Sequence, residues 1–166
     1  GEVMVRRAGR HVAVEFSAVT VVADRADKYA DLGLRTIADA VPALGPAGGL
    51  ATALADRRGR GGAGWLWLVT CDLVAVEGAL LERMLAARGE AGGAVALRDE
   101  RWEPMPGLYH TAIEPAVREH LAAGERAMWK LLERVGAKAV GLEAGEVGPR
   151  QVNTVTELAA WEAAQR

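Results

Sequence analysis

The sequence contains too little cysteine, histidine and long apolar sequence for several classes of protein. Its single cysteine, Cys71, cannot form an internal disulfide, so we expect a reducing, cytoplasmic setting. The three histidines are scattered and show no spacing typical of structural zinc. No apolar run approaches the roughly 20 residues that cross a membrane, and no secretory signal is visible from Gly1 onward. A disulfide scaffold, a zinc module and a membrane-spanning protein are therefore disfavoured.

Charge imbalance, internal repeats and low-complexity segments are lacking as well. The formal net charge of -2 gives no electrostatic argument for binding nucleic acid or an anionic membrane. Hydrophobic residues make up 51% and charged residues 25% of the 166, a balance typical of a globular protein. Because no linker is visible, we expect one domain over residues 1–166.

What the sequence does contain is an alternation of short strands and helices. We expect strands at 17–23, 34–37, 65–69, 94–97 and 137–142, and helices at 26–32, 45–58, 78–88, 114–122, 127–135 and 157–164. Such alternation predicts an α/β domain with a largely parallel sheet. Before the last helix, Thr154 and Glu157 have the spacing of a capping box. Asn153 is then either a turn residue or a group that faces a cleft.

The apolar run Trp65-Leu66-Trp67-Leu68-Val69 is the strongest of these elements. Its length predicts a strand buried on both faces, in the middle of a parallel sheet. Ligands bind beyond the carboxyl ends of such strands, where Asp72 follows. That carboxylate is either a ligand for a divalent cation that bridges to phosphate oxygens, or a cap for a helix that begins near residue 76. Cys71 has no His or Lys beside it in sequence, so we expect it to pack rather than react.

Two further segments are candidates for ligand binding. Gly45-Pro46-Ala47-Gly48-Gly49 opens a helix, where backbone N–H groups can approach an anion or a flat base closely; a tight loop with proline in the first helical turn explains the same residues. The segment is neither a Walker motif nor a dinucleotide fingerprint. Pro104-Met105-Pro106-Gly107-Leu108-Tyr109 excludes a helix and predicts an extended segment, either a strand against the core or a wall of a cleft.

Four segments, taken in order, resemble the molybdenum cofactor guanylyltransferase family. They are Gly45–Leu50, Cys71-Asp72 after its strand, Pro104–Tyr109, and Val152-Asn153-Thr154 followed by Glu157-Leu158. The resemblance covers about residues 17–161. It implies a three-layer αβα sandwich with a mostly parallel sheet, the Rossmann-like nucleotidyltransferase fold. In that family the enzyme joins the GMP part of GTP to molybdopterin carrying molybdenum and releases pyrophosphate, with Mg²⁺ required.

The resemblance also implies roles for individual residues. Asp72 falls on the family's catalytic, magnesium-binding aspartate. The residues implied beside the guanine nucleotide are Asp39, Gly45, Pro46, Gly48 and Gly49, and those implied on the pterin side are Pro104, Pro106, Tyr109 and Asn153. A phosphate of molybdopterin would be the nucleophile, so no strong general base is needed. GTP and molybdopterin are the implied partners, with room for contact with molybdoenzymes or cofactor chaperones, and with no nucleic acid or membrane.

The sequence departs from the family at its amino-terminal end. The family's phosphate-binding loop, Leu-x-Gly-Gly-x-Ser-x-Arg-Met-Gly followed by a lysine, is not found in residues 1–16. Residues 11–16 are too few for the helical crossover that precedes the strand at 17–23. We therefore expect either further residues that supply this loop, or a non-catalytic relative that carries cofactor or contacts a partner enzyme.

A second departure follows Asp72, where Leu73-Val74 replace the family's common Met-Pro. This leaves CTP as donor, or another acceptor, as an alternative. An α/β domain with an unrelated small-molecule site is the third hypothesis.

Overall fold

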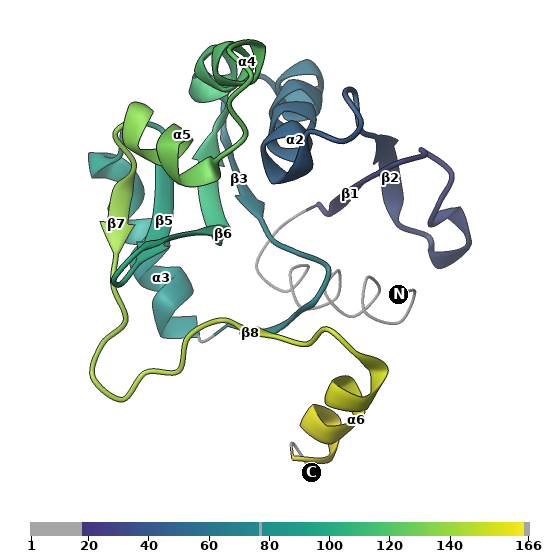
Figure 1. Ribbon diagram of the computed structural model, residues 1–166, viewed down its shortest axis with the longest axis vertical. Helices are drawn as coiled ribbons and strands as arrows, with labels where there is room; N and C mark the ends of the chain where they lie inside the picture. The colour runs from purple at the N-terminus through teal and green to yellow at the C-terminus, as the bar shows by residue number, and fades with distance from the viewer. Residues whose placement is uncertain (1–17, 77, 165–166) are drawn as a thin grey trace.

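The computed structural model describes residues 18–76 and 78–164 (Figure 1). Their strands form three small sheets, and helices connect these strands. β1 (Thr20–Ala23) and β2 (Arg35–Ala38) form a parallel pair. A four-stranded sheet has the order β3 (Trp65–Leu68), β6 (Trp102–His110), β5 (Ala94–Arg98), β7 (Lys138–Val140). β4 (Leu73–Ala75) pairs with β8 (Arg150–Gln151). In these described residues, no helix has the length and apolarity needed to cross a membrane.

The α/β class is confirmed, but the sheets are mixed rather than mostly parallel. β6 is antiparallel to both of its neighbours, β3 and β5, whereas β5 and β7 are parallel. The β4–β8 pair is antiparallel as well. Alternation of strands and helices along the sequence does not report strand direction, because a hairpin between 94–98 and 102–110 needs only a three-residue turn. The predictions made for residues 1–17 lie outside the described residues.

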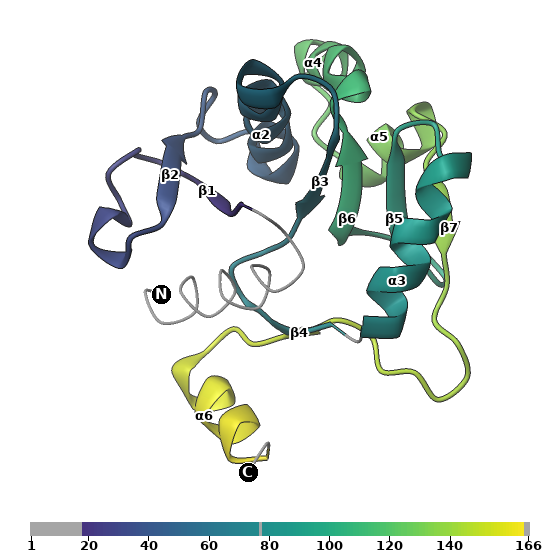
Figure 2. The ribbon, with the colours of Figure 1, turned by 180° about the vertical axis from the view of Figure 1, so that it is seen from behind.

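Helices cover both faces of the four-stranded sheet (Figures 1 and 2). α2 (Gly45–Gly61), α4 (Glu114–Ala122) and α5 (Met128–Arg134) lie on one face, and α3 (Gly78–Ala86) on the other. The alternation along β5 shows this directly: Ala94 and Ala96 join the cluster of α2, α4 and α5, whereas Val95 and Leu97 join that of α3. Around this sheet the chain therefore has three layers.

The strand that begins at Trp65 does not lie in the middle of a parallel sheet. β3 is an edge strand that pairs only with β6 in the described structure, and its residues are half-buried. Leu66 and Leu68 pack toward α2, and Trp65 and Trp67 pack toward α3. The apolar run thus packs against helices on both faces but is only half-buried rather than fully buried as predicted, and no described strand pairs with its other edge.

The proline-rich segment lies within the central strand β6 rather than at an edge. Ala96 pairs with Gly107 and the next residue, Leu97, with Glu103, so residues 104–106 form a bulge without ladder partners on β5. Prolines have no N–H to donate, and a bulge is where an interior strand tolerates them. The segment is a strand against the core through Pro106 and Tyr109, which are buried, whereas Met105 lines a hollow and leaves the interpretation as a cleft wall open.

Helix ends follow their sequence signals closely. α4 has the predicted bounds, with Pro115 in its first turn. The helix predicted at 26–32 is shorter, a 3₁₀ turn over Ala30–Leu32 that ends at Gly33 with φ of 68°. At α6 (Val155–Ala163), Thr154 Oγ1 accepts a hydrogen bond from Glu157 N, and Glu157 Oε2 accepts one from Asn153 N. The capping box is therefore present, reaching back one residue further than the usual pattern.

An arginine–aspartate pair ties the two-stranded sheet to α2. Arg35 on β2 donates to both carboxylate oxygens of Asp56, at 3.0 and 2.6 Å, and Arg60 donates to the same carboxylate at 2.9 Å. The Arg35 guanidinium, more than the nearby Arg60, lowers the pKa of Asp56. A lowered pKa in the folded state means that this carboxylate contributes stability above its unfolded pKa of about 3.9, and that the contribution is lost as pH falls through the folded pKa.

We therefore expect Asp56→Asn to destabilise the protein by roughly 1 kcal/mol at pH 7, because Arg35 is itself partly exposed. The difference from wild type should shrink as pH falls below about 3.9 and disappear below the lowered pKa of the folded state, where Asp56 is protonated in both states. Urea unfolding at several pH values between 7 and 2.5 measures this. Asp27→Asn is the matched control, because Asp27 is 78% exposed in its pair with Arg25 and should show no such change. A constant difference at all pH values would contradict the role of this carboxylate.

Candidate functional site

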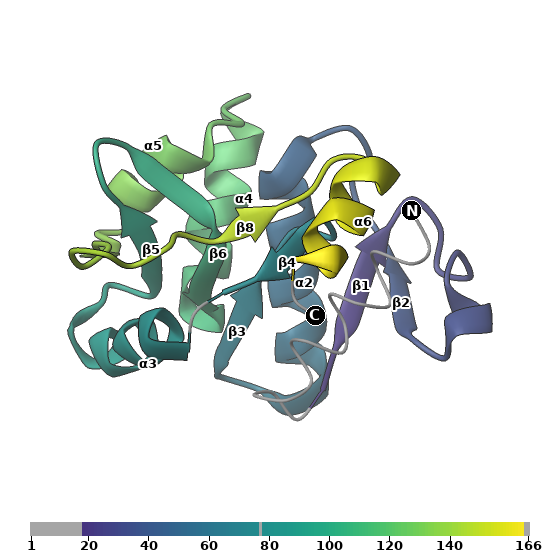
Figure 3. The same cartoon turned by 90° about the horizontal axis from the view of Figure 1, so that it is seen from below.

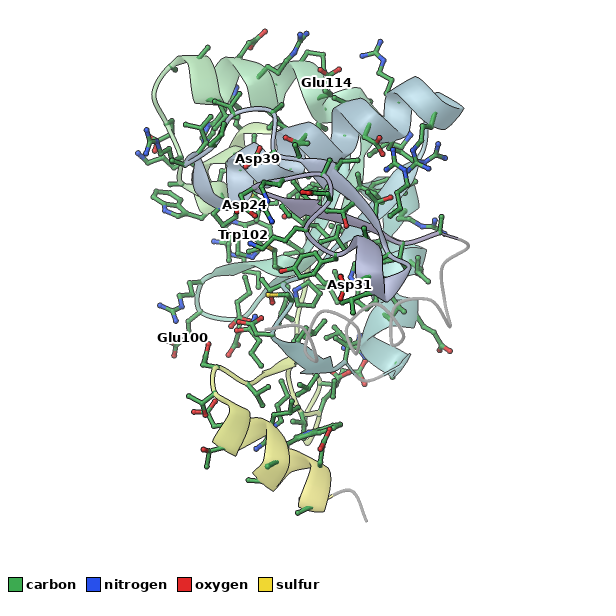
Figure 4. All side chains as sticks on the ribbon, turned by 90° about the vertical axis from the view of Figure 1, so that its right-hand side faces the viewer. Asp24, Asp31, Asp39, Glu100, Trp102 and Glu114 are labelled. Carbon is green, nitrogen blue, oxygen red and sulfur yellow. The ribbon has the colours of Figure 1, made fainter. Side chains whose placement is uncertain are left out.

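An aspartate follows each of the neighbouring strands β1 and β2, and the two aspartates differ in burial and in hydrogen bonding (Figure 4). Asp24 is an exposed residue paired with Lys28 at 2.7 Å, and hydrogen bonding to that lysine lowers its pKa. Asp39 is half-buried; its Oδ1 accepts hydrogen bonds from Thr52 Oγ1 at 2.9 Å and from Val41 N at 3.3 Å. Asp39 is therefore held rigidly between β2 and α2, whereas Asp24 forms an ordinary surface ion pair.

The glycine-rich turn lies against Asp39 at the start of α2. A Cβ on Gly48 would lie 2.8 Å from Leu44 Cβ and 3.7 Å from Asp39 Oδ2, so the backbone approaches this carboxylate closely. Two left-handed positions flank Leu44 just before this turn, Ala43 with φ of 68° and Gly45 with φ of 65°. Such a conformation is uncommon for alanine and is often found at ligand-binding turns. The structure thus brings together the residues predicted for the nucleotide base.

In Figure 3, α2 lies behind the strands β1 and β3. A hollow of about 650 Å³ is lined by residues of these three elements. β1 pairs only with β2, and β3 only with β6, so each strand has an edge without a partner among the described strands. Pro46 and Gly49 of the predicted nucleotide site line the hollow. Five residues that were not among the predicted site residues line it too: Arg57, Arg60, Thr70, Cys71 and Met105. Cys71 is exposed there, contrary to the expectation that it packs.

Asp72 lies in the turn between β3 and β4. It is half-buried, and its Oδ1 has neither solvent contact nor a hydrogen-bond partner in the part of the chain that the structure describes. Since α3 begins only at Gly78, the side chain does not cap that helix. A carboxylate oxygen without a partner is unfavourable in the protein alone, and such an oxygen suits a divalent cation.

A cation at Asp72 would need oxygen ligands from outside the protein. Within residues 18–76 and 78–164, no three His, Cys, Asp or Glu side chains come together as a metal site. Mg²⁺ commonly binds proteins through one or two carboxylates, with water and substrate phosphates completing its shell. The donor set therefore fits a magnesium ion that arrives with a phosphorylated substrate.

The residues predicted for the pterin side are placed unevenly. Tyr109 is fully buried in the core; its hydroxyl donates to Pro104 O at 2.7 Å, and burial raises its pKa. Pro106 is also fully buried, so neither side chain offers surface to a ligand in this structure. Asn153 is exposed, directly after Val152, whose N–H donates to Asp72 O at 3.0 Å. Of this set, Asn153 alone adjoins the turn that carries Asp72.

Comparison with known proteins agrees with this architecture. A family model described as the MobA-like NTP transferase domain matches residues 1–140. A molybdenum cofactor guanylyltransferase of Serratia proteamaculans (strain 568) is 26% identical over 136 residues, 81% of this chain and 67% of that protein. One of Pseudomonas entomophila (strain L48) is 31% identical over 149 residues, 87% of this chain and 75% of that protein.

The fold is shared with solved structures. Molybdopterin-guanine dinucleotide biosynthesis protein A from Archaeoglobus fulgidus superposes with a TM-score of 0.71 at 18% identity, covering 94% of this chain and 84% of that one. A protein from Aquifex aeolicus VF5 reaches 0.77 at 19% identity, covering 92% and 80%. Because the family model spans most of the sequence, the chain belongs to the MobA-like NTP transferase domain family of nucleotidyltransferases.

Proposed function

We propose that this protein transfers GMP from GTP to molybdopterin carrying molybdenum, with Mg²⁺ bound at Asp72. Membership of the MobA-like NTP transferase family supports nucleotidyl transfer, and the names of its relatives support the guanine nucleotide and the molybdenum cofactor. The observation that carries the proposal is the Asp72 Oδ1, which lacks a hydrogen-bond partner among the described residues and belongs to the residue directly after Cys71, which lines a hollow large enough for a ligand. A contact with molybdoenzymes or cofactor chaperones belongs to the same proposal.

In this proposal, the residues at the start of α2 bind the base, and Asp72 binds the cation. Asp39 and the backbone around Gly48 would orient the guanine base, because they are fixed to each other at the start of α2. Asp72 would hold Mg²⁺, which supplies charge neutralisation on the triphosphate and on the departing pyrophosphate. A phosphate oxygen of molybdopterin then forms a bond to the α-phosphorus of GTP, and the bond from that phosphorus to the pyrophosphate oxygen breaks. The attacking oxygen is already anionic, so no side chain has to remove a proton.

A single nucleotidyltransferase domain with helices on both faces of its sheet belongs to the same proposal. The family's phosphate-binding loop is not found in the sequence of residues 1–16, so the described part of the proposed site consists of the Asp39 turn, the hollow and Asp72.

The experiment that tests this function is a transfer assay on the protein with its full native sequence. Incubation with MgGTP and molybdenum-loaded molybdopterin should release pyrophosphate and yield a guanine dinucleotide, detected by mass spectrometry. CTP and ATP are the matched competitors, and we expect both to be poor donors. Preferential use of CTP would replace the guanine assignment by a cytidylyl one. Binding of molybdopterin with no pyrophosphate release from any nucleotide would favour the non-catalytic relative and overturn the proposal.

A further inference from the structure

We propose that Thr70 contacts the nucleotide directly, donating its hydroxyl hydrogen to a phosphate oxygen, and that Gln151 is the positioning residue that orients it. The inference rests on the proposed function, since it requires a nucleotide at Asp72. Thr70 lines the hollow between β1 and β3, two residues before Asp72 in the same turn. Asp72 itself does not line the hollow, but it follows Thr70 by two residues, so a donor from Thr70 and a cation at Asp72 would be close enough to share one group of phosphate oxygens.

The hydrogen-bond polarity of Thr70 favours this role. Its Oγ1 accepts a hydrogen bond from Gln151 Nε2 at 3.2 Å. A threonine hydroxyl has one hydrogen, and an oxygen that already accepts from an amide leaves that hydrogen free to donate. Phosphate oxygens only accept, and hydrogen bonds to charged groups are the stronger kind. The backbone of Thr70 is already engaged, because its carbonyl accepts from Leu73 N at 3.3 Å.

β8 and the residue after it contact both Thr70 and Asp72 and so fix their positions relative to each other. Gln151 contacts Thr70, and the next residue, Val152, donates its N–H to Asp72 O at 3.0 Å. Leu73, which follows Asp72, pairs with Gln151 in the β4–β8 sheet. Val152 is itself anchored, since it is 2% exposed in a cluster with Val74 and Leu158. Gln151 of this strand, which is 81 residues from Thr70 in sequence, and Val152 directly after it fix the turn through contacts on both sides of Cys71.

Substitutions at Thr70 test the contact. Calorimetry with MgGTP should give an affinity at least about tenfold weaker for Thr70→Val, which keeps the shape and removes the hydroxyl. Thr70→Ser, which retains the hydroxyl, should stay within about threefold of wild type. Thr156→Val is the matched control, because Thr156 is an exposed threonine on α6 and should bind MgGTP normally. Unfolding temperatures measured alongside should not separate Thr70→Val from the control.

Substitution of Gln151 tests the orientation. In Gln151→Glu, the carboxylate can only accept, so it takes the Thr70 hydrogen and MgGTP affinity should fall as far as in Thr70→Val. The double variant should be no weaker than either single one. Further loss in the double variant would show that the new charge repels the nucleotide independently of Thr70, and would overturn the role of Gln151.

The outcomes separate this inference from the proposed function. If Asp72→Ala loses MgGTP binding while Thr70→Val binds as wild type does, the nucleotide site stands and the Thr70 contact is wrong. If Asp72→Ala also binds normally, the proposed function itself fails.

Discussion

Replacement of Asp72 by alanine should lower the affinity for MgGTP by at least about 100-fold, the largest functional effect of any single substitution that we expect. The reason is that this carboxylate is the protein's own ligand for the cation, and no cluster of three acidic, histidine or cysteine side chains in the described residues could replace it. A 100-fold loss corresponds to about 2.7 kcal/mol of binding free energy. Calorimetric titration with GTP at saturating and at zero Mg²⁺ measures it.

The same substitution should leave the free protein at least as stable as wild type. Asp72 Oδ1 has no hydrogen-bond partner among the described residues and no solvent contact, so its removal relieves a desolvation penalty instead of breaking a contact. Loss of binding with unchanged or higher unfolding temperature is the signature of a residue retained for a ligand. Asp31→Ala is the matched control, an exposed acid whose loss should alter neither quantity. Wild-type affinity in Asp72→Ala, or affinity independent of Mg²⁺ in wild type, would remove the assignment.

The local elements of the fold were predictable because their signals are local. Pro115 opens α4, Gly33 ends the turn before β2, and Thr154 and Glu157 cap α6, each through contacts within a few residues. Gly45–Gly49 was recognised as the start of a helix for the same reason. The four-stranded sheet's core residues on β5 also follow from a short apolar run.

The pairings between distant segments were not predictable in the same way. β8 has only two residues, too few to show a hydrophobic periodicity. Its sequence therefore does not predict that it pairs with β4 or that Gln151 donates a hydrogen bond to Thr70. The edge position of β3 depends on which strands flank it, which a buried-strand pattern does not contain. Tyr109 was predicted to line a cleft, but it is buried and its hydroxyl donates a hydrogen bond to Pro104 O. For the proposed site, the acids and the glycine turn were predicted from sequence, whereas the proposal of Thr70 and Gln151 required the structure.

Replacement of Gly107 by alanine should have the largest effect on stability, roughly 3 kcal/mol, or a fall of about 10 °C in unfolding temperature. A Cβ at this position would lie 2.4 Å from Pro104 O and 2.8 Å from Tyr109 Cε2. Neither neighbour can move cheaply. Pro104 belongs to the bulge of β6, and Tyr109 is fully buried with its hydroxyl bonded to that same carbonyl oxygen.

The loss should be cooperative because Gly107 pairs on both sides, with Leu68 of β3 and Ala96 of β5. A shift that relieves the clash therefore displaces the strand that leads to Thr70 and Asp72, and MgGTP affinity should fall together with stability. Gly59→Ala is the matched control: nothing lies within 4 Å of a Cβ there, and an alanine on α2 should raise stability by up to about 1 kcal/mol. Thermal unfolding of both variants decides the matter. If Gly107→Ala is as stable as Gly59→Ala, the bulge can accommodate a Cβ without loss of stability, and the prediction for Gly107 is wrong.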